Sequence, residues 1–450
     1  MSAYETAVAR IYALGHELAQ TPSHKFDLEH MRVLLAALDH PEGRFPSVLI
    51  AGTNGKGSTA ATLASILKAS GLRTGLYTSP HLVRINERIR IDGQAIGDDD
   101  FALVHDLVER TAERLVGEGE LPWHPSFFEM LTAIAFEHFA RRKVEIAVLE
   151  VGMGGRLDAT NVVEPRVSVI TDISLDHQKF LGDTVSEIAT EKAGIIRPGG
   201  VVVTLPQQPQ ANDVIGNKIL ELGARAVNAV PYVPPVSPAS SEYLAANAAH
   251  TPVSRYPLQV MGEQITVETP LLGRHQLRNI ALAIAAAEEL ARQGFPITAA
   301  AIERGIRETH WAGRFQVMPA TASAPECVFD VAHNPAGAWA LRSTLSAGYP
   351  DRALTFVFGA MRDKAIGEMA EILFPLAERV IATRADNPRS ATPEEIREAA
   401  TRASTEIEEA ADVSAALELA RTSPPRDGVV VITGSIYIVG EAMRLLGARI

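Results

Sequence analysis

The feature that most limits the fold of this chain is its alternation of short apolar runs with longer helical patterns. Five runs in the first half have the length and composition of buried strands: "SVLIA" (47–51), "TGLYT" (74–78), "IAVLEV" (146–151), "VSVIT" (167–171) and "VVVTL" (201–205). Helical stretches lie between them, which predicts an α/β fold with a doubly wound, mostly parallel sheet. Ligands of such sheets lie beyond the carboxyl ends of the strands, so functional residues are expected there.

A second series of the same kind predicts a second, smaller α/β domain. Its strands are "CVFDVAH" (327–333), "ALTFVFG" (353–359), "RVIATR" (379–384) and "GVVVITG" (428–434). We therefore expect one domain over residues 1–300 and a Rossmann-like C-terminal domain over residues 312–450, in keeping with a length of 450 residues. Between about 206 and 272 the sequence becomes rich in proline and serine and then resembles short antiparallel strands. We interpret that segment as a peripheral insertion.

Charge and cysteine content narrow the class of protein. A formal net charge of -12 disfavours general attraction to nucleic acid or to anionic membranes, although it permits a local basic pocket. Cys327 is the only cysteine, so no internal disulfide is possible. No apolar run reaches the roughly 18 residues that a membrane span needs, and the N-terminal residues lack the order of a signal peptide. These features predict a cytoplasmic protein that binds neither nucleic acid nor membrane.

The stretch "AGTNGKGS" (51–58) predicts a phosphate-binding loop of unusual design. It departs from G-x-x-x-x-G-K-[ST], because Gly57 follows Lys56 and Ser58 comes one residue late. A glycine loop between a buried strand and a helix gathers backbone N–H groups at the positive end of the helix dipole, which favours phosphate. Lys56 can reach terminal phosphates, and Ser58 or Thr59 can help to hold Mg²⁺. The alternative is a turn that needs glycine only for its backbone, and the loop alone does not distinguish a kinase, a GTPase and a ligase.

Polar residues at three further strand ends indicate a magnesium site. Ser79 follows the run at 74–78, Glu150 ends the run at 146–151, and His177 follows the run at 167–171. Taken singly, each has an ordinary explanation as a turn residue, a local ion-pair partner or a polar loop residue. Because three strand ends meet at one edge of the sheet, beside a phosphate loop, together they favour Mg²⁺ ligands.

Two other features remain open on sequence grounds. Lys192 lies in the last turn of the helix predicted from "DTVSEIATEKAGIIRPGG", where a cation favours the helix dipole. Its spacing alone favours an ordinary solvated lysine. The loop "EVGMGGRLDATN" (150–161) follows the acidic strand, and it can be either a substrate-binding loop or a tight structural turn.

Several stretches together resemble the folylpolyglutamate synthase and dihydrofolate synthase family, within the Mur-ligase-like ATP-dependent amide ligases. The matching stretches are "AGTNGKGS", "YTSPHLVRINERIRI", "FFEMLTAIAF", "LEVGMGGRLDATN", "DHQKFLGDTVSEIATEKAGI", "GRHQLRNIALAIAA", "WAGRFQ", "FDVAHNPAG", "FGAMRDK", "DNPR" and "GSIYIVGE". They run in family order from about residue 25 to 441, which is far more specific than any one motif. The segment from about 206 to 255 matches poorly.

The resemblance implies roles for individual residues. ATP would be bound by Thr53, Asn54, Gly55, Lys56, Gly57, Ser58, Asn279, Arg314 and Asp330. Two Mg²⁺ ions would be held by Ser79, Glu150, His177 and an N-carboxylated Lys192. The pterin side of the substrate would meet Lys25, Phe26, Ser126, Phe127, Phe128, Glu129, Leu157, Asp158 and Ala159. Lys56, Lys192 and His333 would take part in catalysis, His333 near the phosphates or the incoming glutamate.

The implied activity is the addition of L-glutamate to a folate, with ATP as cosubstrate and an acyl phosphate as intermediate. The matches at 126–129 and 157–159 favour a bifunctional enzyme that also glutamylates dihydropteroate. The resemblance further implies a monomer. Alternatives are a Mur-type ligase acting on another carboxylate acceptor and a P-loop kinase or GTPase, which would need no glutamate.

Overall fold

The computed structural model describes residues 2–15, 27–235, 245–246, 252–321, 324–402, 406–422 and 428–450. The chain forms two compact units. The first comprises Met1–Pro234, Leu258–Ile265 and Arg278–Glu308, and the second comprises Pro235–Pro257, Thr266–Leu277 and Thr309–Ile450. No helix among the described residues has both the length and the apolar character needed to cross a lipid bilayer.

The first unit contains an eight-stranded sheet in the order β4-β3-β2-β5-β1-β6-β7-β8. Its strands are β1 (Ser47–Ala51), β2 (Thr74–Tyr77), β3 (Ile89–Ile91), β4 (Gln94–Ala95), β5 (Ile146–Glu150), β6 (Val167–Ile170), β7 (Val201–Thr204) and β8 (Arg225–Asn228). Only β3 and β4 run antiparallel to their neighbours. The predicted doubly wound, mostly parallel sheet is thus confirmed, and β1 lies inside it between β5 and β6.

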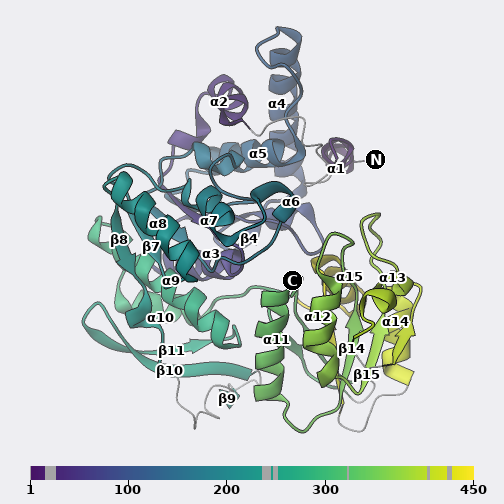
Figure 1. The fold of residues 1–450 in the computed structure, drawn as a ribbon. Helices are drawn as coiled ribbons and strands as arrows, with labels where there is room; N and C mark the ends of the chain where they lie inside the picture. Colours follow the sequence, from purple (N-terminus) through teal and green to yellow (C-terminus); the bar gives the residue numbers. More distant parts are fainter. Residues whose placement is uncertain are drawn as a thin grey trace. The chain divides into compact units, whose positions relative to one another are not determined.

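Helices surround this sheet, some packed on the sheet itself and others on neighbouring helices (Figure 1). They are α1 (Ala3–Ala13), α2 (Leu28–Ala37), α3 (Lys56–Ala69), α4 (Asp98–Gly117), α5 (Phe127–Arg141), α6 (Gln178–Leu181), α7 (Val185–Ala193), α8 (Pro209–Glu221), α9 (Arg274–Arg292) and α10 (Ala299–Arg307). Helix α3 is buried along most of its length, since it packs on both the sheet and α10. The contact with α10 is so close that a Cβ on Gly305 would lie 2.4 Å from Cα of Ile66. The helix that follows the glycine loop is therefore a fixed part of the core.

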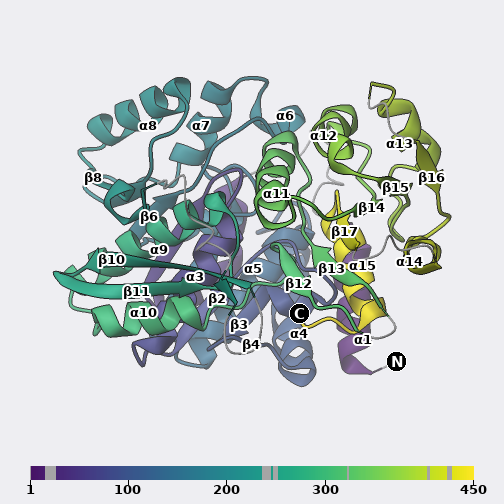
Figure 2. The same cartoon turned by 90° about the horizontal axis from the view of Figure 1, so that it is seen from below.

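The segment at 206–272 differs from the expected peripheral insertion. Its first part forms α8 and β8, and β8 pairs in parallel with β7, so residues 209–228 extend the main sheet. The sequence did not reveal this last β-α-β step, because the residues of β8 are mostly exposed and lack an apolar pattern. The expected antiparallel strands follow as β10 (Pro252–Val260) and β11 (Glu263–Thr269), which Figure 2 shows side by side. They join β9 (Ala245–Ala246) in a three-stranded sheet.

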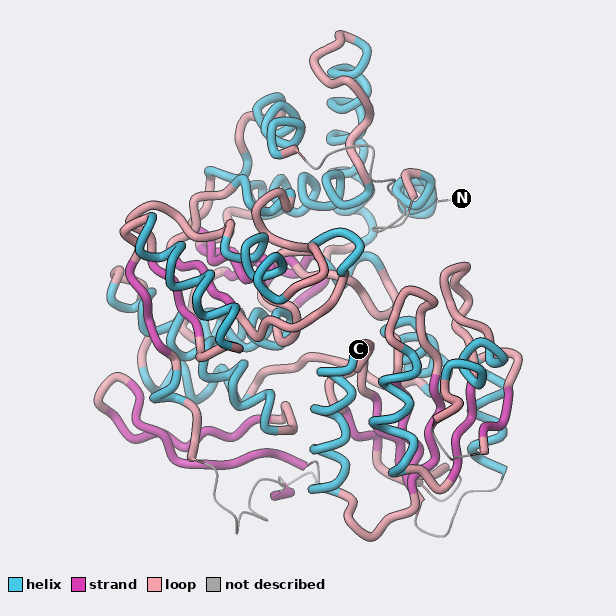
Figure 3. The backbone as a smooth tube through the Cα atoms, viewed as in Figure 1, coloured by secondary structure: helices cyan, strands magenta, loops and turns pink. Residues whose placement is uncertain are grey.

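The second unit contains a six-stranded sheet in the order β12-β13-β17-β14-β15-β16. Its strands are β12 (Gln316–Met318), β13 (Glu326–Phe329), β14 (Leu354–Phe358), β15 (Arg379–Ala382), β16 (Ile407–Glu409) and β17 (Val429–Thr433). Its helices are α11 (Pro335–Gly348), α12 (Ile366–Leu373), α13 (Pro393–Ala399), α14 (Val413–Thr422) and α15 (Ile436–Leu446). All pairings except β12 with β13 are parallel, and helices alternate with strands (Figure 3). The predicted Rossmann-like α/β character is confirmed.

Candidate nucleotide and substrate site

The glycine loop joins β1 to α3 at the carboxyl end of the sheet, as the sequence predicts. Two glycines let it pack against its surroundings. A Cβ on Gly52, whose φ is +154°, would lie 1.8 Å from Oγ1 of Thr171. A Cβ on Gly55, whose φ is +88°, would lie 2.1 Å from Oδ1 of Asn279. These glycines are required because both the left-handed backbone and the close contacts exclude a side chain.

The loop is also held to the segment that follows β6. The N–H groups of Thr53 and Asn54 donate to the carbonyl oxygen of Asp172, at 2.8 and 3.1 Å. The hydroxyl of Thr53 donates to the carbonyl of Ser174 at 3.0 Å, and the amide of Asn54 donates to the hydroxyl of Ser174 at 3.1 Å. In this structure, therefore, the side chains of Thr53 and Asn54 fix the loop's shape.

Two lysine amines meet at the carbonyl oxygen of Gly52. Nζ of Lys56 donates to it at 3.0 Å and also to the carbonyl of Thr53 at 3.1 Å. Nζ of Lys192 donates to the same oxygen at 2.8 Å from the end of α7. Lys192 is only 4% exposed, so the interpretation of this residue as an ordinary solvated lysine is wrong. Helical spacing could not reveal this, because the burial comes from the packing of α7 beside the loop.

Burial changes the chemistry of Lys192. Desolvation, followed by the charge of Lys56, lowers the pKa of Lys192 to about 7, although Asp176 and Asp158 oppose the shift. A buried lysine with this pKa is largely an uncharged amine at slightly alkaline pH. An uncharged amine is a nucleophile, whereas an ammonium group is not.

Ser79 and Glu150, two of the predicted magnesium ligands, lie together. Glu150 ends β5, is 4% exposed, and accepts a hydrogen bond from the backbone N–H of Ser79 at 3.2 Å. Ser79 follows β2, which pairs in parallel with β5. Because both residues lie at the carboxyl edge of the sheet, a buried carboxylate and a hydroxyl-bearing residue are available there as hard oxygen donors.

His177 occupies a strained position before α6. Its φ is +51°, and its backbone N–H donates to the carboxylate of Asp176 at 2.8 Å. Over the residues that the structure describes, no three His, Cys, Asp or Glu side chains gather as a metal site. The predicted ligand set contains one glutamate and one histidine, together with a serine and a lysine, so this absence does not test the set. The magnesium assignment therefore stays a prediction.

The loop at 150–161 combines tight turn geometry with a connection to Lys192. The buried carboxylate of Asp158 accepts the N–H groups of Met153 and Thr160, each at 3.0 Å. Burial raises the pKa of Asp158, while these hydrogen bonds oppose the rise. The amide of Asn161 donates to the carbonyl of Gly194 at 3.2 Å. Since Gly194 ends α7, the loop fixes the helix that carries Lys192.

The start of α5 holds four of the residues predicted to bind folate. Ser126 and Glu129 form a capping box, so both already have a structural role. Phe127 is buried, whereas the half-buried Phe128 packs against the loop: a Cβ on Gly152 would lie 2.6 Å from Cζ of the ring. In the 157–159 stretch, Leu157 is half-buried and Ala159 is buried. The predicted contacts Lys25 and Phe26 lie outside the described residues.

Sequence reasoning missed His30, which lies on α2 and contacts Glu129. Its Nδ1 lies 3.1 Å from Oε1 of Glu129, and its Nε2 lies 3.0 Å from the carbonyl oxygen of Trp123. Burial alone would lower the pKa of His30, but the hydrogen bond and charge of Glu129 outweigh it and raise the pKa. Burial would raise the pKa of Glu129, but His30 and Ser126 hold it below its usual value. No motif could have shown this pair, since 99 residues separate its members.

We expect His30→Gln to lower the free energy of unfolding by about 1–3 kcal/mol near pH 5.5, because it leaves the Glu129 carboxylate beside a neutral amide and without its charged partner. The His30 contribution is full below the ordinary histidine pKa of 6.5 and falls as pH rises through the raised value. The Glu129 contribution is full above 4.5 and falls as pH drops through the lowered value. Urea unfolding at pH 5.5 and 9 measures the His30 contribution, because the Glu129 contribution is full at both pH values. An equal loss at both pH values would contradict the ion pair.

In the second unit, Asp330 follows β13 and is 7% exposed. Its carboxylate accepts the N–H groups of Phe315 and Ala332, each at 2.9 Å. Burial raises the pKa of Asp330, against the charge of Arg314. Nδ1 of His333 lies 2.9 Å from the carbonyl oxygen of Val331. The end of β13 is thus surrounded by Arg314, Asp330 and His333. The remaining predicted ATP contact, Asn279, belongs to the first unit and packs on Gly55.

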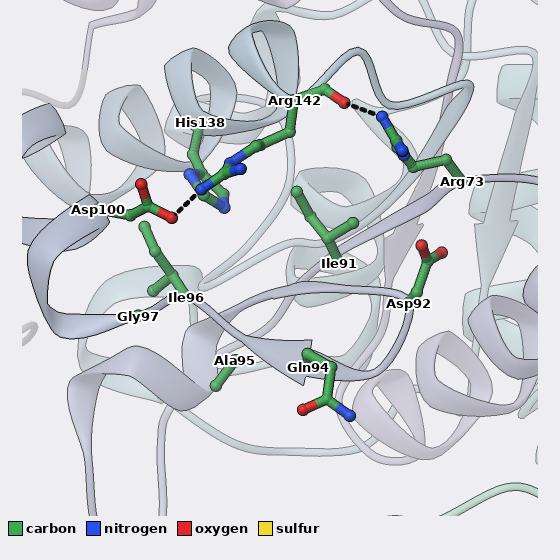
Figure 4. Close-up of a pocket in the computed structure, with 10 residues that line it drawn as sticks. All are labelled: Arg73, Ile91, Asp92, Gln94, Ala95, Ile96, Gly97, Asp100, His138 and Arg142. Carbon is green, nitrogen blue, oxygen red and sulfur yellow. Dashed lines mark hydrogen bonds and ion pairs between the residues drawn. The ribbon is translucent and has the colours of Figure 1, made fainter.

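The first unit also contains a pocket of about 310 Å³ (Figure 4). Arg73 and Arg142, which line it, precede β2 and β5, so it lies at the amino edge of those parallel strands. Arg142 pairs with Asp100, and Arg73 donates to the carbonyl oxygen of Arg142 at 2.9 Å. None of the predicted site residues lines this pocket.

Comparisons with known proteins identify the class. Residues 125–287 match the Mur ligase middle domain, and residues 313–436 match the Mur ligase glutamate ligase domain. The two matches show that the chain is built from the domains of the Mur ligase class.

The relatives identify the family within that class. The dihydrofolate synthase/folylpolyglutamate synthase of Bacillus subtilis is 33% identical over 93% of this chain and 94% of its own length. A probable bifunctional folylpolyglutamate synthase/dihydropteroate synthase of Haloferax volcanii is 38% identical over 92% of this chain, which spans only 48% of that longer protein. The structure of the Mycobacterium tuberculosis folylpolyglutamate synthase, solved with ADP and AMPPCP, is similar to this chain with a TM-score of 0.85 and 33% sequence identity. The similarity covers 98% of this chain and 99% of the Mycobacterium tuberculosis chain. The chain belongs to the folylpolyglutamate synthase and dihydrofolate synthase family and is a ligase.

Proposed function

We propose that this protein joins the amine of L-glutamate to the carboxylate of a folate at the expense of ATP, and that it also glutamylates dihydropteroate. The observation that carries the proposal is the pair of lysine amines, from Lys56 and Lys192, at the carbonyl of Gly52. A lysine on the glycine loop with a buried second amine beside it supports this proposal. The name of the Bacillus subtilis relative, dihydrofolate synthase/folylpolyglutamate synthase, supports the choice of folate and dihydropteroate as acceptors.

A carboxylate does not acylate an amine at neutral pH, because oxide is too poor a leaving group. Transfer of the γ-phosphoryl group from ATP to the carboxylate gives an acyl phosphate, in which phosphate becomes the leaving group. The amine of glutamate then attacks the acyl carbon, the nitrogen loses one proton to solvent, and the carbon–oxygen bond to phosphate breaks. The protein contributes mainly position and charge neutralisation to such a transfer. In this chain the N–H groups at the start of α3, together with Lys56, would bind the phosphates.

We assign the magnesium sites to Ser79, Glu150, His177 and a carboxylated Lys192. The buried carboxylate beside Ser79 fits a hard cation, and the uncharged Lys192 amine can add to CO₂. That addition forms a nitrogen–carbon bond and releases one proton, which leaves a carbamate anion. The carbamate nitrogen keeps one N–H, so its hydrogen bond to Gly52 can persist. Bound Mg²⁺ would neutralise phosphate charge.

The pterin side is assigned to Phe128 and the loop at 157–159, with Asn279, Arg314, Asp330 and His333 as the remaining nucleotide and glutamate contacts. We expect Gly152→Ala to displace the Phe128 ring, because the added Cβ would lie 2.6 Å from its Cζ. KM for the folate should rise about tenfold, in the range that pocket-shape changes give, while KM for ATP stays unchanged. Steady-state kinetics measure both. Gly117→Ala is the control, since no atom lies within 4 Å of its added Cβ.

Product analysis tests the proposed reaction. The protein is incubated with Mg-ATP and glutamate plus either dihydropteroate or tetrahydrofolate, and the products are separated by mass. We expect a mass increase of one glutamyl residue with each acceptor. Labelling the acceptor carboxylate with ¹⁸O should transfer one label to phosphate. ADP release that needs no glutamate, with no glutamylated product, would instead indicate a kinase or GTPase.

We also propose that the protein acts as a monomer in the cytoplasm. The single cysteine, Cys327, is buried, and burial raises the pKa of its thiol to about 11, so it is unreactive at neutral pH. Light scattering on the purified chain should give a mass near 48.3 kDa.

A further inference from the structure

Arg278 joins two strand ends beneath the glycine loop. It lies in the second turn of α9, and its NH2 donates to Oδ1 of Asp172 at 2.6 Å while its Nε lies 3.2 Å from both carboxylate oxygens. The same NH2 donates to the carbonyl of Pro206 at 3.0 Å. Asp172 follows β6 and Pro206 follows β7, so one guanidinium holds the ends of two neighbouring parallel strands.

The residue that Arg278 holds also holds the loop. The carbonyl oxygen of Asp172 accepts the N–H groups of Thr53 and Asn54, the first two residues after Gly52. Asn279, which follows Arg278 on the same helix, touches Gly55 at the other end of the loop. Two adjacent residues of α9 thus act on the two ends of the loop, one by direct contact and one through Asp172.

We propose that Arg278 is a positioning residue for the nucleotide loop, acting through Asp172. Its charge is directed to the Asp172 carboxylate, so it does not serve as a phosphate ligand. The side chains of Arg278 and Asp172 are 32% and 37% exposed, too open for such a pair to contribute much to global stability. The function of the pair is to fix the Asp172 peptide and, with it, the N–H groups at 53 and 54. This inference rests on the proposed binding of ATP at the loop.

The test is a double-mutant cycle with Arg278→Gln, Asp172→Ala and the double variant. Isothermal titration measures Kd for Mg-ADP, and steady-state kinetics measure KM for ATP and for glutamate. Arg278→Lys tests rescue, because lysine keeps the charge but loses the planar two-nitrogen contact. Arg110→Gln is the matched control, since it removes a guanidinium from an exposed pair with Asp106 on α4.

Each single substitution should weaken nucleotide binding about five- to thirtyfold, the effect of losing one or two kcal/mol. The double variant should be no weaker than either single variant, because both remove the same linkage. KM for ATP should rise with the nucleotide Kd, KM for glutamate should stay unchanged, Arg278→Lys should be intermediate, and Arg110→Gln should match the wild type.

Other outcomes overturn the inference. If Arg278 bound phosphate directly, Asp172→Ala would leave binding unchanged or tighten it. If the pair were only structural, both KM values would change along with the melting temperature. A wild-type protein that fails to bind Mg-ADP would instead refute the proposed nucleotide site itself.

Discussion

Lys192→Ala should reduce ligation by about 10³-fold, the scale of losing a main electrostatic group from an active site. The substitution removes the buried amine that donates to Gly52 and that we expect to carry the carbamate. Circular dichroism and melting temperature should stay close to wild type, because removing a buried amine also removes its desolvation cost. The measurement is glutamylated product per minute at saturating Mg-ATP. Near-normal turnover would remove Lys192 from the mechanism.

The pH dependence of the same residue gives an independent readout. Lys192 must lose its proton before it can bind CO₂, and its pKa lies at about 7. Only about one-tenth of the amine is uncharged one unit below that value, so activity should fall as pH drops from 8 to 6, and added bicarbonate should partly restore it. Lys218→Ala, a surface variant on α8, should keep the wild-type profile. No bicarbonate effect at pH 6 would argue against a carbamate.

Gly52→Ala should reduce kcat/KM for ATP at least about 10²-fold, because small displacements at a reacting site have effects of that size. The added Cβ would lie 1.8 Å from Oγ1 of Thr171, at a φ of +154° that side chains rarely adopt. The loop must move, and with it the carbonyl that both lysines share. The free energy of unfolding should also fall by about 1–3 kcal/mol.

Gly216→Ala provides the matched control for this change. Gly216 lies within α8, and no atom lies within 4 Å of its added Cβ. Alanine there should leave activity unchanged and raise stability slightly, by about 0.5–1 kcal/mol. Wild-type nucleotide kinetics in Gly52→Ala would show that the loop tolerates displacement and does not bind the phosphates.

The sheet architecture followed from the sequence because strand length and helical periodicity are local signals. Strand β1, the helix after the glycine loop and the helix that carries Lys192 lie where the sequence placed them. Strand β8 was missed since its residues are mostly exposed at the edge of the sheet and lack an apolar pattern. Edge strands do not need the burial on both faces that makes inner parallel strands recognisable.

The candidate site was only partly predictable, because some of its contacts join segments that are distant in the sequence. Ser79 and Glu150 could be placed together because both end parallel strands. The burial of Lys192 depends on how α7 packs beside the loop, and the His30 contact with Glu129 joins distant segments. Such contacts have no periodic signature, so only three-dimensional packing reveals them.

Because Lys56 and Lys192 both donate to the carbonyl oxygen of Gly52, a substitution of Lys56 also changes the surroundings of Lys192. Lys56 is the nearby charge that lowers the pKa of Lys192. Removing it would let the Lys192 pKa rise and would favour the protonated amine at neutral pH. A defect in a Lys56 variant would therefore combine lost phosphate binding with impaired modification of its neighbour. An alkaline shift in that variant's pH optimum would separate the two contributions.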